Sequence, residues 1–270
     1  MNNSDHWLQP CRARPLVIAH GDEGGRGLYP GNTLLYLQKM VALGVDALEI
    51  DLNLTADGHL VLLHDGTLER TTDGSGQVKD KTLQELEALN AAYHWSPDGE
   101  QFPYRKDPQP LVTIDQAFAA CPDTPMVIEL KNDDPRAAQS LARAIEKAGG
   151  EARLIVSSFH RNVIRTFRSL CPRVATGATL PEALLFFAAQ CVFAERLLKP
   201  AFRTMQLPVS YYGLPVFTRW FVSAARRCGL HISVWTVNEP EAMKKFIALG
   251  LDGIVTDRPD RLLKLFQTSS

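Results

Sequence analysis

Short apolar runs alternate along this chain with longer segments in which apolar residues recur every three or four positions. The short runs have the length of buried strands and cover residues 16–20, 46–55, 60–64, 126–131, 154–159, 174–178, 205–209, 232–237 and 253–257. Helical periodicity marks residues 34–43, 83–89, 135–148, 217–227 and 240–249. Repeated alternation of this kind is typical of a parallel sheet, and about eight units predict an α/β fold, a (β/α)8 TIM-type barrel.

The nine strand candidates exceed the places in such a barrel by one, and a turn at Asp57-Gly58 indicates which strand is extra. Only a few residues separate 46–55 from 60–64, too few for a helical crossover, so these segments are expected to pair antiparallel. A turn centred just before Asp57 would place Glu49 opposite His64. An extended return would instead make 60–64 a parallel neighbour, and both arrangements bring Glu49 and His64 together.

Two further segments do not follow the alternation. Residues 91–111 are rich in aromatic residues and show no clear period, and a loop of this length in a compact domain is commonly functional or disordered. The aromatic residues favour function. Residues 183–198 are the most apolar stretch, but Gln190, Glu195 and Arg196 interrupt it, and it falls short of the roughly 20 residues that a spanning helix needs. A packed helix is favoured there over a lipid contact.

The composition is sufficient for one large core, because 45% of the 270 residues are apolar. We expect an N-terminal extension, residues 1–15, followed by a single barrel domain, residues 16–270, with an aromatic-rich insertion near 91–111. The formal net charge of −1 provides no general attraction to nucleic acid. Basic groups are therefore expected to act locally, on an anionic small molecule.

The expected compartment follows from the amino terminus and the cysteines. The first fifteen residues contain no apolar segment of the kind that a secretory signal requires. Five scattered cysteines without a Cys-x-x-Cys pair are typical of reduced thiols. We therefore predict a cytoplasmic protein without a transmembrane segment, and peripheral contact with a membrane stays open.

Six chemically active groups stand at the ends of apolar runs: His20, Glu49, Asp51, His64, Glu129 and Lys131. Glu49 and Asp51 are two positions apart, so both project from the same face of a strand. Three crowded carboxylates repel one another unless a cation neutralises them, and an all-oxygen set fits Ca²⁺ or Mg²⁺ better than Zn²⁺. Two histidines beside such a cation suit proton transfer to and from a phosphate ester. The pattern indicates a metal-dependent hydrolase.

Several motifs, in a fixed order, carry a resemblance to one known family. They are Ile18-Ala19-His20, residues 27–33 and 44–51, His64-Asp65, and residues 70–74, 128–131, 234–238 and 252–257. In order and spacing they resemble the signature of the glycerophosphodiester phosphodiesterases, over nearly the whole chain after residue 15. The resemblance implies a barrel of the phospholipase C type, and hydrolysis of a small glycerophosphodiester to glycerol 3-phosphate and an alcohol.

The resemblance also implies roles for individual residues. The metal ligands would be Glu49, Asp51 and Glu129, and the acid/base pair would be His20 and His64. Lys131 would be the phosphate-binding cation. Trp235 would form the wall beside the glycerol or the leaving group. The chemistry of the residues leaves open which histidine is the acid. It also leaves open whether water or the neighbouring glycerol hydroxyl attacks phosphorus.

The chain departs from the family pattern directly after the first histidine, where members commonly have arginine and this chain has Gly21. The candidate replacement for that phosphate-binding group is Arg26, in a longer and more acidic loop. The departure keeps open a catalytically weakened barrel that binds a phosphodiester. Another alternative is a lysophospholipase D-like hydrolase of lysophospholipids, with residues 91–111 or 183–198 holding the acyl chain.

Overall fold

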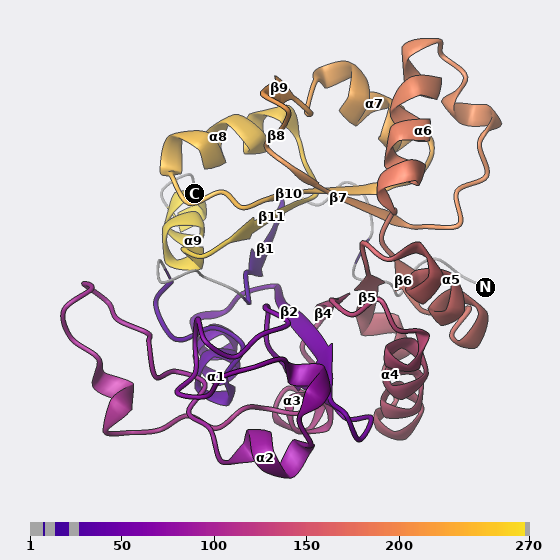
Figure 1. The fold of residues 1–270 in the computed structure, drawn as a ribbon. Coiled ribbons are helices and arrows are strands. Elements are labelled where there is room, and N and C mark those ends of the chain that lie inside the picture. Colours follow the sequence, from indigo (N-terminus) through magenta and orange to yellow (C-terminus); the bar gives the residue numbers. More distant parts are fainter. Residues whose placement is uncertain (1–7, 9–13, 22–26, 268–270) are drawn as a thin grey trace.

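The computed structural model describes residues 8, 14–21 and 27–267, and eight parallel strands of this part of the chain form a barrel (Figure 1). They are β1 (Leu16–Ala19), β2 (Ala47–Leu54), β4 (Met126–Leu130), β5 (Leu154–Ser157), β6 (Ala175–Thr176), β7 (Thr204–Pro208), β10 (His231–Trp235) and β11 (Gly253–Thr256). Their order in the sheet is β6-β5-β4-β2-β1-β11-β10-β7. A parallel bridge between Gly177 and Thr204 joins the two edges, so the barrel is nearly closed. The predicted fold class is confirmed.

Helices cover the outside of the barrel (Figure 1). They are α1 (Leu34–Leu43), α2 (Leu83–Glu87), α3 (Ile114–Ala120), α4 (Pro135–Ala148), α5 (Arg161–Leu170), α6 (Leu180–Cys191), α7 (Arg219–Arg227), α8 (Pro240–Leu249) and α9 (Pro259–Gln267). The ranges predicted from periodicity match α1, α4 and α8 at both ends, whereas α3, α5 and α9 fall outside the predicted set. A capping box between Thr113 and Gln116 begins α3, and this short motif is the signal that could have identified it.

Apolar residues of the strands point alternately into the barrel and toward the helices. The interior cluster consists of small and branched residues, among them Leu16, Ile18, Ala47, Val127, Ile155 and Val255. Residues between these positions, such as Leu48, Ile50 and Leu52 of β2, pack against the helices instead. Because both faces of the strands are buried, the strands read in the sequence as nearly continuous apolar runs.

The extra strand is β3 (Leu60–Leu62), which pairs antiparallel with the end of β2. The loop between them is centred on Asp57, and Gly58 adopts the left-handed conformation that such short loops require (φ 88°). The predicted hairpin is confirmed. The observed register pairs Leu52 with Leu62. It differs by one residue from the register that would place Glu49 opposite His64, because the loop is centred on Asp57 and not just before it.

Residues 91–111 extend away from the barrel as the long loop at the lower left of Figure 1. Their regular structure is the short 3-10 helix η3 (Pro103–Arg105). The aromatic residues contact one another and a cation: the guanidinium of Arg105 lies 3.9 Å from the ring centre of Phe102 and 4.7 Å from that of Tyr93. The aromatic residues thus stabilise the loop itself.

The apolar helix expected at residues 183–198 is α6, which is shorter and begins earlier. A capping box between Thr179 and Glu182 sets its start, and after its end the chain turns into the 3-10 helix η5 (Glu195–Leu197). The helix packs against α7 through the fully buried Phe186, as predicted, but most of its large apolar side chains are exposed. No helix of the described residues is long and apolar enough to cross a membrane.

Candidate active site

A cavity of about 150 Å³ opens at the carboxyl ends of the barrel strands, the end at which barrel enzymes have their sites. Among the residues that line it are seven predicted site residues: His20, Glu49, Asp51, His64, Glu129, Lys131 and Trp235. The remaining predicted residue, Arg26, lies outside the described residues. His20, Glu49, Asp51, Glu129 and Lys131 continue the inward-facing rows of β1, β2 and β4, whose first members are apolar, so strand alternation brings these five together.

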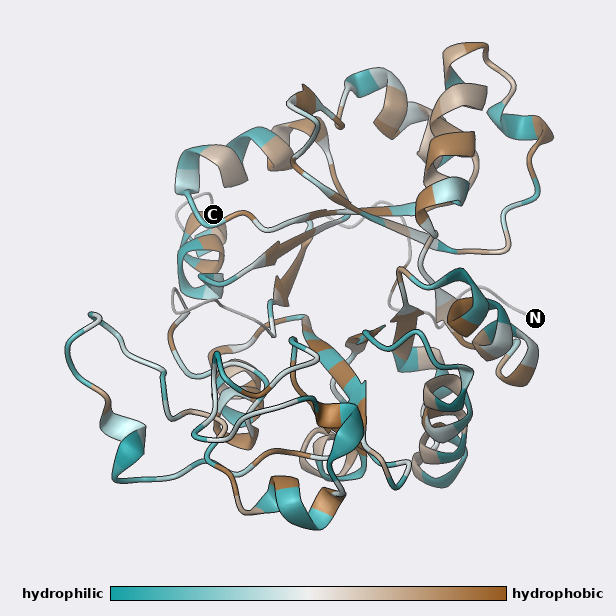
Figure 2. Ribbon diagram, in the orientation of Figure 1, coloured by the Kyte–Doolittle hydropathy of each residue, from teal (hydrophilic) through white to brown (hydrophobic). Residues whose placement is uncertain are grey.

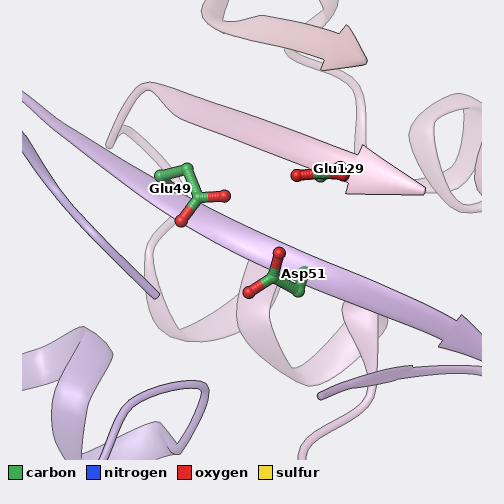
Figure 3. Close-up of side chains that lie close together, drawn as sticks. All are labelled: Glu49, Asp51 and Glu129. Atoms are coloured by element: carbon green, nitrogen blue, oxygen red, sulfur yellow. The ribbon is translucent and has the colours of Figure 1, made fainter. Parts of the chain in front are cut away.

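The three acids form a compact, largely buried cluster. Glu49 and Asp51 come from β2, and Glu129 lies beside Asp51 on the neighbouring strand β4 (Figure 3). One carboxylate oxygen from each lies within 4.8 Å of the others. Burial and the charge of Asp51 raise the pKa of Glu49 to about 8, and burial also raises the pKa of Glu129. Negative charge is therefore concentrated here beyond what the surroundings stabilise.

Hydrogen bonds from loop residues orient two of the acids. The backbone N–H of Gly21 donates to Oε2 of Glu49 at 2.8 Å. The side-chain amide of Asn32 donates to Oδ2 of Asp51 at 3.0 Å and accepts from the Asp51 backbone N–H at 3.2 Å. Asn32 holds this position in the left-handed conformation (φ 55°), which asparagine tolerates better than most residues.

Lys131 partly neutralises the cluster. Its Nζ lies 3.0 Å from Oδ1 of Asp51 and 3.0 Å from Oε2 of Glu129. Burial alone would lower the pKa of Lys131, but the charges of Asp51, Glu129 and Glu49 raise it, so the ammonium stays protonated.

The donor set fits a hard divalent cation. One ammonium faces three acids, and Oε1 of Glu129 is buried without a hydrogen-bond partner among the described residues. A buried oxygen of this kind is costly unless something positive approaches it. Carboxylate oxygens without nitrogen or sulfur ligands are the set that Ca²⁺ and Mg²⁺ prefer.

His20 is held by an acid from the far end of the chain. Its Nδ1 lies 2.7 Å from Oδ1 of Asp257, which follows β11, and the amide of Asn238 donates to the other oxygen of Asp257. Burial alone would lower the pKa of His20, but the hydrogen bond to Asp257 and the charge of Glu49 raise it to about 9. Asp257 and Asn238 were both missed as site residues, although both occur in motifs that carry the resemblance.

His64 is oriented in a similar way by its chain neighbour. Its Nδ1 lies 2.8 Å from Oδ1 of Asp65, and Nε of Arg70 donates to Oδ2 of Asp65 at 2.6 Å. Burial would raise the pKa of Asp65, but the hydrogen bonds from Arg70 and His64 lower it. Each histidine therefore has Nδ1 against a carboxylate, and both rings line the cavity.

The other walls of the cavity are mainly small or apolar. Trp235 stands at the end of β10, where sequence analysis placed a wall, and Phe159, Ala178 and Val255 line the cavity with it. No lining residue comes from 91–111 or 183–198, so neither segment reaches the part of the cavity that the described residues form.

The backbone of β2 leaves no room for a side chain at position 21. A Cβ atom built there would lie 2.5 Å from the backbone oxygen of Glu49 and 3.2 Å from Cα of Ile50. The arginine that commonly follows the first histidine in the family therefore does not fit this backbone. Among the described residues that line the cavity, Lys131 is the one basic side chain besides the two histidines.

We expect Gly21→Ala to disturb the acid cluster, because the added methyl pushes against β2 and moves the N–H that holds Glu49. Affinity for Ca²⁺ should fall roughly tenfold, the value of one charge-assisted hydrogen bond, as measured by calorimetric titration. Gly66→Ala is the matched control, since a Cβ at Gly66 meets nothing within 4 Å. Equal affinities of the two variants would contradict the role assigned to the Gly21 N–H.

The chain is similar in sequence to known proteins. The chain matches the glycerophosphoryl diester phosphodiesterase family over residues 23–261. A glycerophosphodiester phosphodiesterase of Caldanaerobacter subterraneus is 34% identical over 261 residues, which cover 93% of this chain and 98% of that protein. A glycerophosphodiester phosphodiesterase of Bacillus altitudinis is 30% identical over 258 residues, covering 92% of this chain and 97% of that protein.

Solved structures share the fold. The glycerophosphoryl diester phosphodiesterase domain of an uncharacterized Mycobacterium tuberculosis protein superposes with a TM-score of 0.81 at 22% identity, covering 94% of this chain and 99% of that one. A phosphodiesterase of Oleispira antarctica, solved in complex with the product sn-glycerol-3-phosphate, gives a TM-score of 0.75 at 23% identity, covering 94% and 97%.

Proposed function

The chain belongs to the glycerophosphoryl diester phosphodiesterase family, whose reaction is the hydrolysis of glycerophosphodiesters, and from this premise we propose how its own residues perform that reaction. Glu49, Asp51 and Glu129 hold a divalent cation, Ca²⁺ or Mg²⁺. His20 and His64 transfer protons. The products are glycerol 3-phosphate and an alcohol.

The phosphodiester would be bound by Lys131 and by the cation that the three acids would hold. A cation bound by the three carboxylates supplies Lewis-acid stabilisation for the negative charge that develops on the phosphate oxygens. Lys131 lines the same cavity, and its ammonium donates to a phosphate oxygen. Trp235 limits the position of the glycerol or of the leaving group, so that the ester meets both imidazoles.

The two imidazoles divide the proton transfers between them. One takes a proton from the attacking group, which is water or the neighbouring glycerol hydroxyl, and the oxygen of that group forms a bond to phosphorus. The other gives a proton to the alkoxide oxygen, whose bond to phosphorus breaks. Where the glycerol hydroxyl attacks, a cyclic phosphate forms first, and water then opens it to glycerol 3-phosphate. Asp257 and Asp65 keep the rings oriented and stabilise the protonated forms, as carboxylates beside catalytic histidines do.

One observation carries this proposal: three carboxylates, two carboxylate-oriented histidines and a lysine line a single cavity. The direct test incubates the protein with a panel of glycerophosphodiesters and measures glycerol 3-phosphate, with chelator and after addition of Ca²⁺ or Mg²⁺. We expect release only with the cation. Absence of release from every substrate under all these conditions would favour the alternative of a phosphodiester-binding barrel without activity.

The apolar side of the cavity supports a second candidate, hydrolysis of lysophospholipids. Phe159, which is 67% exposed, lines the cavity together with Trp235, and such apolar walls can contact an acyl chain. Choline release from glycerophosphocholine and from lysophosphatidylcholine, compared in one assay, distinguishes the two. A higher kcat/KM for the lysophospholipid would assign the enzyme to that class.

Asp257→Asn tests the positioning of His20. The substitution keeps the shape but removes the charge that stabilises the imidazolium, so the pKa of His20 should fall from about 9 toward 6.5. We expect kcat to fall about 10²-fold and the pH–rate profile to move to lower pH. Asp260→Asn, on α9, is the control. A lower kcat with an unchanged pH profile would indicate a merely structural role for Asp257.

A further inference from the structure

Helix α6 exposes apolar side chains to solvent on the outside of the barrel. Apart from Glu182 and Gln190, all its residues are apolar, so it has no polar face to turn outward. With the loop that follows and the start of α7 it forms what we call the α6 surface: Leu184, Leu185, Phe187, Val192, Phe193, Leu197 and Trp220, each at least 43% exposed. Figure 2 shows α6 in tan and brown along most of its length. Contiguous exposed apolar patches mark interaction sites.

Aromatic contacts join the parts of the α6 surface. The rings of Phe193 and Trp220 lie 6.3 Å apart between centres, and Phe187 lies 6.1 Å from the buried Phe221 of α7. Phe193 is 71% exposed and Trp220 is 67% exposed. The two rings contact each other on the outside of the molecule, and most of the surface of each is exposed.

Two exposed aromatic residues hold unusual backbone conformations in this region. Phe193 has φ 57°, and Tyr212, between the short strands β8 (Ser210–Tyr211) and β9 (Leu214–Pro215), has φ 49°. The left-handed conformation is unfavourable for bulky residues, and such residues cluster at functional positions. Tyr212 is 91% exposed, so the β8–β9 hairpin presents a further aromatic group just before α7.

The charge of this part of the chain is strongly positive. Residues 161–230 contain ten arginines and lysines but two acids, although the whole chain has a net charge of −1. Both acids are already paired: Glu182 with Arg168, and Glu195 with Arg227. Lys199 follows the exposed Leu197, and Arg219 precedes Trp220. Within the described residues these two exposed cations form no ion pair.

We propose that the α6 surface docks this protein onto an anionic lipid bilayer. Exposed aromatic and aliphatic side chains enter the interfacial region, where tryptophan and tyrosine are favoured, while arginine and lysine bind the lipid headgroups. A second copy of the chain is the less favourable occupant. A symmetric dimer through this surface would bring its own excess of positive charge face to face.

The position of the surface relates it to the cavity. Gly177 and Ala178 line the cavity, and α6 begins two residues after them. Gln206 of β7 also lines it, and the β8–β9 hairpin follows β7 directly. The chain that lines the cavity therefore continues directly into the α6 surface and into the hairpin. The docking itself does not depend on the catalytic roles proposed above.

Sedimentation with vesicles tests the proposal without measuring turnover. The full chain should co-sediment with phosphatidylcholine vesicles that contain phosphatidylglycerol, but not with pure phosphatidylcholine, and high salt should release it. Lys199→Glu with Arg219→Glu should weaken partitioning at least tenfold, because each cation near such a surface is worth about fivefold. Phe193→Ser with Trp220→Ser should weaken it by a similar factor.

Matched controls make the result decisive. Lys106→Glu with Lys245→Glu changes the charge equally at exposed positions elsewhere, and Val41→Ser with Leu43→Ser removes exposed apolar groups from α1. Both controls should bind like the wild type. Equal loss in the controls, or no binding to anionic vesicles, would overturn the proposal. The proposal would also be overturned if the wild type did not bind vesicles but formed a dimer in light scattering, and if Phe193→Ser with Trp220→Ser dissociated that dimer.

Discussion

Asp51→Asn and Glu129→Gln are each expected to abolish turnover while the barrel stays folded. Each substitution removes one negative charge from a cluster whose oxygens otherwise face one another, and a charge-assisted contact is worth roughly ten- to a hundredfold in affinity. Calorimetric titration of chelator-treated protein with Ca²⁺ and Mg²⁺ should show that loss. Thermal unfolding should show a midpoint near that of the wild type, or above it, because the repulsion between the acids is reduced.

Chelation of the wild-type protein should have the same effect, and addition of Ca²⁺ or Mg²⁺ should reverse it. Glu87→Gln, on the exposed side of α2, serves as the control because it removes a carboxylate outside the cavity. Full turnover after thorough removal of divalent cations would contradict the proposed dependence on a metal ion. Retained turnover in both cluster variants would do so independently.

The second large effect is expected for His20→Ala and His64→Ala. Loss of a proton-transfer group typically costs about 10² to 10⁴ in rate, whereas neither imidazole belongs to the acid cluster. We therefore expect kcat to fall by that factor while the affinity for Ca²⁺ stays within a few-fold. The separation of rate from cation affinity is the distinguishing readout.

His59→Ala is the matched control for these variants, since His59 is exposed in the loop between β2 and β3 and does not line the cavity. It should retain wild-type kcat. A histidine variant that stays near the wild-type rate across the pH range has been assigned the wrong role. A variant that loses Ca²⁺ affinity as well as rate would point instead to distortion of the acid cluster.

Much of the barrel could be predicted from the sequence because strand alternation is a local property. Glu49 and Asp51 belong to one strand, Glu129 belongs to its neighbour and Lys131 directly follows that neighbour, so the shared face of each pair depends only on spacing. The antiparallel β3 hairpin was likewise expected from a short turn. Its register was missed by one residue, because a pattern of apolar residues does not specify where within a loop the chain reverses.

The contacts of His20 could not be predicted from a local pattern. Asp257 is 237 positions away, and only the parallel pairing of β1 with β11 brings the two ends of these strands together. The exposed face of α6 was missed for a related reason. Apolar residues on all sides of a helix indicate burial in general, but they do not reveal which sides another element covers. The position of Arg26 lies outside the described residues and stays a prediction.

The hydrogen bond between His20 and Asp257 also orders events during synthesis on the ribosome. The three acids and His64 precede Asp257 in the chain, so Asp257 is made after all of them. Until β11 emerges, one edge of β1 has no neighbour, and His20 lacks the carboxylate that orients it. A nascent chain therefore carries the groups proposed to bind a cation well before the proposed acid/base pair is complete, and the pair is completed only when the two ends of the barrel meet.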